Sequence, residues 1–374
     1  IYSIFYNLSS SKVNSKSKTR TIIEERINNI ERPLKISAIQ KGYIPLYYPT
    51  RLKKYSIEEG FAPIGSIPFK NSFYCTEGYG LITYKTDRFG LRNKDSNWDN
   101  VLNKSNVFVI GDSFTHGSCV EDKYSITSNI QNYTNINSLN LGNAGSDPYE
   151  YMEMMKILVS PILEESDKSN WLVINYYAND NIEPNFEKEI LLNNAKSIIN
   201  INKNNEVSPI KDYLDNLLNL INRYYPSSES AMINQYKKNI SSKKKNWKSN
   251  ILPKVLTLEP IRNQTKQFYM NYIKTSPTES SIKLLSNICK NKCKPIIVYI
   301  PNQEFWFDGK VSNQYKQILR DKAEKYNITF LDGGDIIDSK KLEDYSPAEP
   351  NGPHLSIQGY RKIAELITTK LGSK

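Results

Sequence analysis

The sequence contains few of the residues that enzymes most often use as general bases or transition-metal ligands. Among 374 residues there are two histidines, His116 and His354, and four cysteines. A mechanism that needs an imidazole base therefore has two candidates, and so few histidines give no indication of a transition-metal site. The sequence also has no apolar run of the length that crosses a bilayer. With 39% hydrophobic and 24% charged residues, the composition is that of a globular protein.

Motifs that bind nucleotides or nucleic acids are missing as well. The glycines between residues 111 and 117 do not follow the Gly-x₄-Gly-Lys-Ser/Thr spacing, and no Gly-x-Gly-x-x-Gly motif opens a predicted helix. The net charge is +11, but much of the excess lysine lies in the polar stretches 9–20 and 241–248. We interpret these stretches as solvated loops, and we expect no nucleic-acid partner, because no recognisable nucleic-acid module accompanies the charge.

From residue 105 onward, short apolar segments alternate with amphipathic ones, which predicts a parallel sheet covered by helices. Predicted strands lie at 107–110, 138–141, 172–177, 296–300 and 329–331, and predicted helices at 123–133, 148–158, 277–291, 312–325 and from 356. The alternation stops between 179 and 277, too long for an ordinary connection. We therefore predict a mainly helical insertion at about 182–276, which could form a lid over the active face. Residues 1–103 are predicted to be an extension, with a strand at 80–84, that packs on the domain of residues 104–374.

The first predicted strand runs into a polar turn that carries Ser113. Open parallel sheets bind ligands at the carboxyl ends of their strands, where a hydroxyl can point out of the sheet. A serine nucleophile needs a base within hydrogen-bond reach. His354, on the loop before the final helix, can fold over this edge, whereas we expect His116 to be structural. The simpler alternative is that Asp112 and Ser113 only cap a helix.

Four blocks of the sequence resemble those of the SGNH (GDSL-type) hydrolase family. They lie at residues 111–114, 140–145, 178–180 and 354–359, in the order that the family shows. The resemblance implies a three-layer α/β/α, flavodoxin-like fold with about five parallel strands, and no metal or other cofactor. It also implies that Ser113 is the nucleophile and His354 the base. The oxyanion hole would then consist of the N–H groups of Ser113 and Gly145 and the side-chain amide of Asn179.

One position departs from the family pattern. Asn351 stands where the family has the aspartate that completes the catalytic triad. An asparagine can orient an imidazole through its carbonyl, but it offers no charge to stabilise the imidazolium. Glu349 is a nearby alternative carboxylate, and Asp112 is a supporting residue beside the nucleophile.

The cysteines form two candidate pairs. Cys289 and Cys293 lie four residues apart and have no second metal-binding pair nearby, so a disulfide is favoured over a zinc site if the protein is extracytoplasmic. A disulfide between Cys75 and Cys119 would tie the N-terminal segment to the active face; two buried thiols are the alternative. The apolar residues 1–6 suggest the end of a signal or a membrane anchor upstream of Ile1.

Together these features predict a serine esterase of the bacterial envelope. It would be an O-acyl hydrolase or transferase, with O-acetyl the favoured group, acting on an acylated glycan or a related ester through an acyl-Ser113 intermediate. The alternative is a catalytically weakened protein of the same fold that takes part in binding or assembly during envelope polysaccharide biosynthesis. Residues 86–93 look like the extension that precedes the hydrolase core in envelope-associated members of the family.

Overall fold

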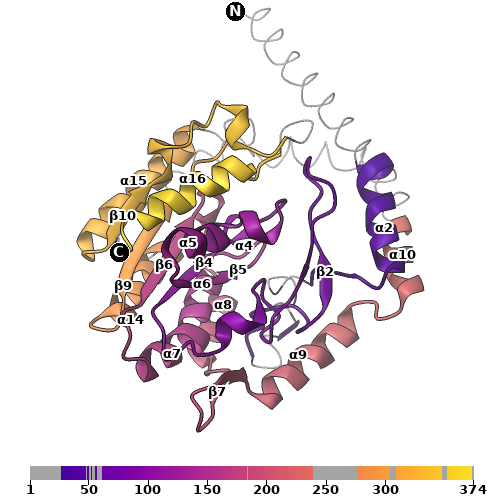
Figure 1. Ribbon diagram of the computed structural model, residues 1–374, viewed down its shortest axis with the longest axis horizontal. Helices are drawn as coiled ribbons and strands as arrows, with labels where there is room; N and C mark the ends of the chain where they lie inside the picture. Colours follow the sequence, from indigo (N-terminus) through magenta and orange to yellow (C-terminus); the bar gives the residue numbers. More distant parts are fainter. Residues whose placement is uncertain are drawn as a thin grey trace, which may run out of the picture.

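A five-stranded parallel sheet forms the centre of the molecule (Figure 1). The computed structural model describes residues 27–47, 49, 52, 55–56, 61–182, 184–238, 276–303, 309–347 and 352–372. The strand order is β10-β9-β6-β4-β5. The strands are β4 (Asn106–Gly111), β5 (Asn137–Gly142), β6 (Trp171–Tyr176), β9 (Lys294–Tyr299) and β10 (Thr329–Asp332). All five predicted strands are therefore present, and their pairing is parallel throughout.

Helices cover both faces of the sheet, which explains why β4 and β6 are buried along their whole length and are mostly apolar. Side chains of a strand alternate between the two faces, and the sheet accordingly separates two apolar clusters. One face is covered by α5 (Ile126–Thr134) and α16 (Ile357–Thr368). The other is covered by α6 (Pro148–Met154), α14 (Pro277–Cys289) and α15 (Gly309–Lys325). The predicted three-layer α/β/α architecture is confirmed.

Several predicted boundaries need correction. The helix predicted at 123–133 begins at Ile126, because Ser125 caps it by accepting a hydrogen bond from the Ser128 N–H. The helix predicted at 148–158 continues through a π-helical turn, Met155–Val159, into α7 (Ser160–Glu165). The strand predicted at 80–84 is wrong in its first half, since β3 covers only Thr83–Lys85.

The insertion is not wholly helical. It contains α8 (Phe186–Asn194), α9 (Lys211–Tyr224) and α10 (Glu229–Lys238), but also the antiparallel pair β7 (Ile199–Ile201) and β8 (Val207–Pro209). The lysine-rich stretches 9–20 and 241–248 lie outside the described residues. The apolar face of α9 joins the main core, where the Tyr213 hydroxyl accepts a hydrogen bond from the Ile64 N–H at 3.0 Å. Helix α9 of the insertion thus packs against the N-terminal extension.

The N-terminal extension is a small layer of its own beside the main sheet. It comprises a π-helical turn, Ile27–Glu31, α2 (Arg32–Gln40) and a three-stranded sheet of β1 (Ile44–Pro45), β2 (Asn71–Phe73) and β3. A 3₁₀ turn, Asp95–Trp98, leads toward β4. Figure 1 shows α2 alongside α10 of the insertion, and the two share a small apolar cluster. Within the described residues, no helix combines the length and apolarity needed to cross a membrane.

A buried carboxylate organises the segment that joins the extension to the sheet. Asp87 Oδ1 accepts hydrogen bonds from the N–H groups of Phe89 and Leu91, at 2.9 and 2.8 Å. Its Oδ2 accepts from Trp98 Nε1 at 2.7 Å and from Asn93 Nδ2 at 2.9 Å. Asp87 is fully buried. Its removal would leave the N–H groups of Phe89 and Leu91 and the Trp98 Nε1–H without an acceptor in a region that excludes water. Asn93 Nδ2 would keep only the Asn140 carbonyl as an acceptor.

We therefore expect Asp87→Ala to lower the free energy of unfolding by about 3 kcal/mol, as measured by urea denaturation. Asp99→Ala is the matched control, because Asp99 pairs with Arg88 at 2.7 Å but its side chain is 56% exposed. The control should cost less than about 1 kcal/mol. Equal losses in the two variants would contradict a structural role for the Asp87 network.

Candidate functional site

Ser113 lies where the sequence predicts, at the carboxyl edge of the sheet. β4 ends at Gly111, and a single helical turn, α4 (Ser113–His116), begins after Asp112. Asp112 caps this turn, since its Oδ1 accepts a hydrogen bond from the Phe114 N–H at 2.9 Å. The turn lies very close to β5: a Cβ added to Gly142 would come within 2.4 Å of the His116 backbone nitrogen. A glycine at position 142 thus lets α4 seat against the sheet.

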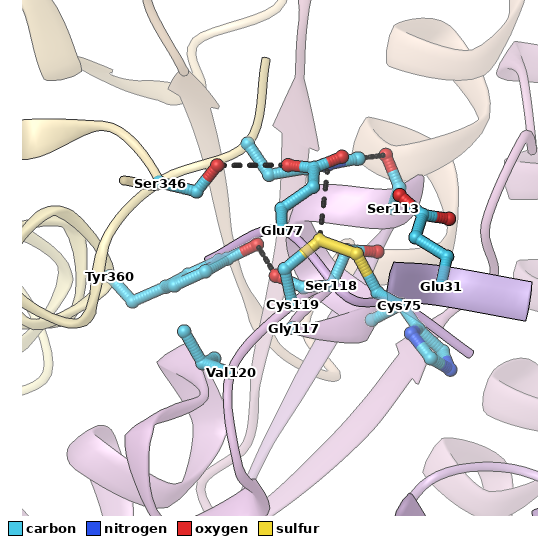
Figure 2. Close-up of a disulfide and its surroundings, with 12 residues drawn as sticks. Glu31, Cys75, Glu77, Ser113, Gly117, Ser118, Cys119, Val120, Ser346 and Tyr360 are labelled. Carbon is cyan, nitrogen blue, oxygen red and sulfur yellow. Dashed lines mark hydrogen bonds and ion pairs between the residues drawn. A yellow bond between two sulfur atoms is a disulfide. The ribbon is translucent and has the colours of Figure 1, made fainter. Parts of the chain in front are cut away.

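The hydroxyl of Ser113 is the first member of a row of three side chains, Ser113, His354 and Glu77. Figure 2 labels the two ends of the row, Ser113 and Glu77. Ser113 Oγ is 2.9 Å from His354 Nε2, and His354 Nδ1 is 3.0 and 3.1 Å from the two carboxylate oxygens of Glu77. An ionised carboxylate can only accept a hydrogen bond, so Nδ1 of a neutral His354 carries the proton and donates it. Nε2 is then the acceptor for the Ser113 O–H. This is the arrangement in which an imidazole can take a proton from a serine.

Glu77 is a candidate site residue that sequence reasoning missed. It lies in the extension, in the loop between β2 and β3, and is 277 positions away from His354 in the chain. The expected partners Asn351 and Glu349 fall outside the described residues, so their predicted roles stay predictions. The sequence did hold one signal: a disulfide between Cys75 and Cys119 would bring the residues next to Cys75 to the turn after Ser113.

Both candidate cysteine pairs, for which the sequence left free thiols as the alternative, are disulfides, and one of them adjoins the row. Cys75 pairs with Cys119, and Cys289 pairs with Cys293. Sγ of Cys119 lies 3.5 Å from His354 Nδ1. Cys75, Cys119, Glu77 and His354 each offer an atom of a kind that binds metals, and these atoms lie within 4.8 Å of one another. The two sulfurs are bonded together, however, and metal binding by cysteine requires thiolates.

The other predicted site residues stand at neighbouring strand ends. Gly145 lies in the loop after β5, is exposed and has a φ of 80°. Asn179 is exposed and follows β6, in the 3₁₀ turn Ala178–Asp180. Since β5, β4 and β6 are adjacent in the sheet, the structure brings Ser113, Gly145 and Asn179 to one edge. Groups there can hydrogen bond to a substrate that contacts Ser113.

Two buried carboxylates lie close to this edge. Asp180 Oδ1 accepts a hydrogen bond from the Tyr151 hydroxyl at 3.0 Å, and its Oδ2 accepts from the Tyr177 N–H at 2.8 Å, which fixes the turn that presents Asn179. Burial and the nearby charge of Asp112 raise the pKa of Asp180 well above its usual range. Burial also raises the pKa of Asp112 to about 6, although the hydrogen bond from the Phe114 N–H and the charge of His354 oppose this rise.

The turn that follows α4 is held by an arginine from the extension. The Arg92 guanidinium donates hydrogen bonds to the carbonyl oxygens of Gly117 and Val120, both at 2.7 Å. From the other side, the Tyr360 hydroxyl donates to the Ser118 carbonyl at 2.9 Å. Cys119 lies within this turn and has a φ of 71°. The position of Cys119 is therefore strongly constrained.

The second histidine, His116, is the last residue of α4. The His116 ring is buried, and its Nε2 is 3.2 Å from the Tyr84 hydroxyl. Burial, followed by the positive charges of Arg92 and His354, lowers the pKa of His116 well below its usual range. His116 therefore stays neutral near pH 7, and its surroundings fit the structural role that the sequence suggested.

The electrostatic setting of His354 is different. Burial lowers the pKa of His354, but the Glu77 carboxylate, through its charge and its hydrogen bonds, and the charge of Asp112 together outweigh burial. The net effect is a pKa above the ordinary value for histidine. The imidazolium form, which a serine mechanism generates in its transition state, is thereby favoured.

Comparisons with known proteins give matches among solved structures. No family model matches the chain, and no curated protein matches it. The similar structures include a member of the lipolytic protein G-D-S-L family from Veillonella parvula, with 12% identity and a TM-score of 0.34, covering 71% of this chain and 97% of the other. They also include Est24, a carbohydrate acetylesterase from Sinorhizobium meliloti, with 11% identity and a TM-score of 0.36. This match covers 72% of this chain and 98% of Est24. Members of the family that the sequence resembles are thus among the matches.

The electrostatic coupling of His354 to Glu77 is directly measurable. With two histidines in the chain, an NMR titration should show one ring, His116, that stays neutral, and a second, His354, with a pKa above about 6.5. Glu77→Gln should lower the pKa of His354, because it removes the neighbouring negative charge. An unchanged pKa in this variant would contradict the pairing of Glu77 with His354. Ser346→Ala removes a neutral partner of Glu77 and serves as the control.

Proposed function

We propose that this protein is a serine ester hydrolase in which Ser113, His354 and Glu77 form the catalytic triad. The observation that carries the proposal is the continuous row from Ser113 Oγ through the imidazole to the Glu77 carboxylate. Nucleophilic acyl transfer needs three parts: a serine hydroxyl, an imidazole whose second nitrogen is hydrogen-bonded, and a carboxylate. Here the carboxylate is that of Glu77, which is partly buried. The triad is recognised by geometry and not by sequence position.

The reaction follows from this geometry. His354 Nε2 takes the proton of Ser113 as Oγ attacks the ester carbonyl, and Glu77 stabilises the imidazolium that results. The N–H groups of Ser113 and Gly145 and the amide of Asn179 are the donors that we assign to the developing oxyanion. His354 then returns the proton to the departing alcohol, which leaves an acyl-Ser113 intermediate. Water attacks this intermediate through the same base, releases the acid and restores the hydroxyl; in a transferase, a sugar hydroxyl would take the place of water.

The position of Glu77 favours an active enzyme over the weakened binding or assembly protein. The alternative depended on the missing charge at Asn351. Glu77 supplies such a charge at His354 Nδ1, at 3.0 Å. We therefore favour catalysis, with an O-acyl glycan or a related ester as the substrate class that the sequence resemblance implies. The two disulfides support an oxidising, extracytoplasmic location.

Labelling of the nucleophile tests the proposal first. The wild-type protein should react with an ester-like phosphonate at Ser113 and hydrolyse a small aryl acetate, since both reactions use the activated hydroxyl. Ser113→Ala should abolish labelling and reduce kcat by a factor of about 10⁴ or more. Mass spectrometry locates the label. Labelling at another residue, or equal hydrolysis by the variant, would overturn the assignment of Ser113.

A pair of variants distinguishes Glu77 from Asn351 as the acid partner. Glu77→Gln should reduce kcat/KM for the aryl ester by about 10³–10⁴, the order seen when a triad loses its carboxylate. Asn351→Asp should change kcat/KM by less than about threefold, because Nδ1 already has a charged partner. The reverse pattern, a small loss for Glu77→Gln and a large gain for Asn351→Asp, would assign the role to position 351 instead.

The pH profile provides a third check on this function. His354 must be neutral to accept the proton, so kcat/KM should rise with pH through the pKa of His354, which lies above the ordinary value. In Glu77→Gln the pKa of His354 falls, so the acid limb of the kcat/KM profile of the remaining activity should shift to lower pH. A profile whose acid limb is the same in both proteins would argue against His354 as the base.

A further inference from the structure

We propose that the Cys75–Cys119 disulfide positions Glu77, so that the row of Ser113, His354 and Glu77 is complete only in the oxidised protein. The consequence for activity rests on the function proposed above. The positioning itself is a separate physical statement, because it concerns the contact between Glu77 and His354 whatever reaction follows. The two sulfurs lie within 4.8 Å of a Glu77 carboxylate oxygen, and Figure 2 shows the disulfide next to Glu77.

Glu77 lies on the part of its hairpin that lacks sheet pairing. The last backbone bonds across the hairpin run from Tyr74 N to Ile82 O at 3.1 Å and from Ile82 N to Cys75 O at 2.9 Å. Beyond them the chain forms a tip, residues 76–81, in which Gly78 and Gly80 have φ values of 84° and 78°. A tip with such glycines has many accessible backbone conformations. The carboxylate of Glu77 therefore needs an anchor outside the hairpin to stay at one place.

The disulfide supplies this anchor from a fixed point. Cys119 is fully buried, within the turn that Arg92 and Tyr360 hold by hydrogen bonds to its neighbours Val120 and Ser118. The other end, Cys75, is two residues from Glu77. A covalent link between segments that are 44 positions apart removes much of the conformational freedom that must be lost for the two to meet.

Weaker contacts complete the placement but cannot replace the covalent link. Glu77 accepts a hydrogen bond from the Ser346 hydroxyl at 2.9 Å, and the Tyr79 hydroxyl accepts one from the Ile357 N–H at 3.4 Å. Each of these bonds is worth little net free energy, because water satisfies the same groups when the tip moves away. Catalytic groups must stay within a fraction of an ångström of their productive positions. The Cys75–Cys119 disulfide can hold the carboxylate of Glu77 in such a position, whereas single hydrogen bonds to a glycine-containing tip cannot.

Reduction would act on the row in two ways. A dithiol supplies two electrons and two protons: the S–S bond breaks, two thiols form, and the dithiol becomes a disulfide. The tip that carries Glu77 is then released. At the same time the new Cys119 thiol lies near His354 Nδ1, at a sulfur–nitrogen distance of 3.5 Å in the oxidised protein. It can compete for His354 as a neutral partner that offers no stabilising charge.

The second disulfide provides a matched control. Cys289–Cys293 joins the end of α14 to the residue that precedes β9, so it lies toward the amino edge of the sheet, opposite to Ser113. Its loss removes a covalent link of the same kind without touching the row. Differences between the two cysteine-pair variants therefore report on position and not on the general cost of losing a disulfide.

The test compares Cys75→Ala/Cys119→Ala with Cys289→Ala/Cys293→Ala by NMR titration of His354 and by aryl ester hydrolysis. We expect the first variant to lower the pKa of His354 nearly as far as Glu77→Gln does, and to reduce kcat/KM by about 10²-fold. Adding Glu77→Gln to it should change neither value much further, because both changes remove the same contact. The Cys289/Cys293 variant should retain the wild-type pKa and rate.

The outcomes separate the two proposals. Suppose that Cys75→Ala/Cys119→Ala keeps the wild-type pKa of His354, and that adding Glu77→Gln to this variant lowers the pKa as much as Glu77→Gln does in the wild-type protein. Glu77 then reaches His354 without the disulfide, and the inference is wrong. If the pKa falls as expected but wild-type protein neither hydrolyses esters nor reacts with the phosphonate, the positioning role stands and the proposed function fails.

A second route covers a variant that does not fold. Wild-type protein is reduced with a dithiol in the presence of EDTA, which prevents zinc capture by the freed thiols, Glu77 and His354. Thiols are counted by alkylation, and His354 is titrated in protein that circular dichroism shows to be folded. A fall in its pKa, reversed on reoxidation, supports the inference. An unchanged pKa with both thiols of the 75–119 pair alkylated overturns it, as does loss of the whole fold on reduction, since the disulfide would then stabilise the protein generally.

Discussion

The proposed chemistry depends on the hydrogen bonds at both ring nitrogens of His354. A neutral histidine has one ring nitrogen that donates a hydrogen bond and one that accepts. An acceptor beside one nitrogen keeps the proton there, which leaves the other nitrogen free to accept a proton. In this protein Glu77 holds Nδ1 of His354, and Ser113 faces Nε2. The two partners come from different parts of the chain, Ser113 from the parallel sheet and Glu77 from the extension. The extension is thus an integral part of the site.

Much of the buried polar structure can be understood from this requirement. Asn93 forms two hydrogen bonds with the backbone of Asn140, at 3.0 and 2.7 Å, and so joins the extension to the edge strand β5. Arg92 binds the turn after α4, and the Asp87 network orders the segment between them. These buried charged groups have their hydrogen bonds supplied by the protein, as burial requires. Together they keep the extension in register with the sheet edge at which Ser113 lies.

A comparison of particular elements shows how far the sequence could be interpreted. The runs at β4, β6 and β9 are apolar because both faces of a parallel sheet are covered, and this composition is visible locally. Ser113 was singled out because it follows such a strand, whereas Gly145 and Asn179 were assigned from the resemblance of residues 140–145 and 178–180 to blocks of the SGNH family. The extension was harder to predict, since β1, β2 and β3 have only two or three residues each. Segments of this length carry too little periodicity to indicate their pairing.

The sequence by itself therefore determined the layered sheet, and it singled out Ser113, His354 and two candidate cysteine pairs, because these depend on local pattern or on a very small number of candidates. Only the tertiary structure decided which carboxylate meets His354. Glu77 and His354 are separated by 277 positions, and thirty-nine acidic residues offered no local feature to single out one of them. Their meeting depends on the path of the whole extension across the sheet edge and on a disulfide that ends two residues from Glu77.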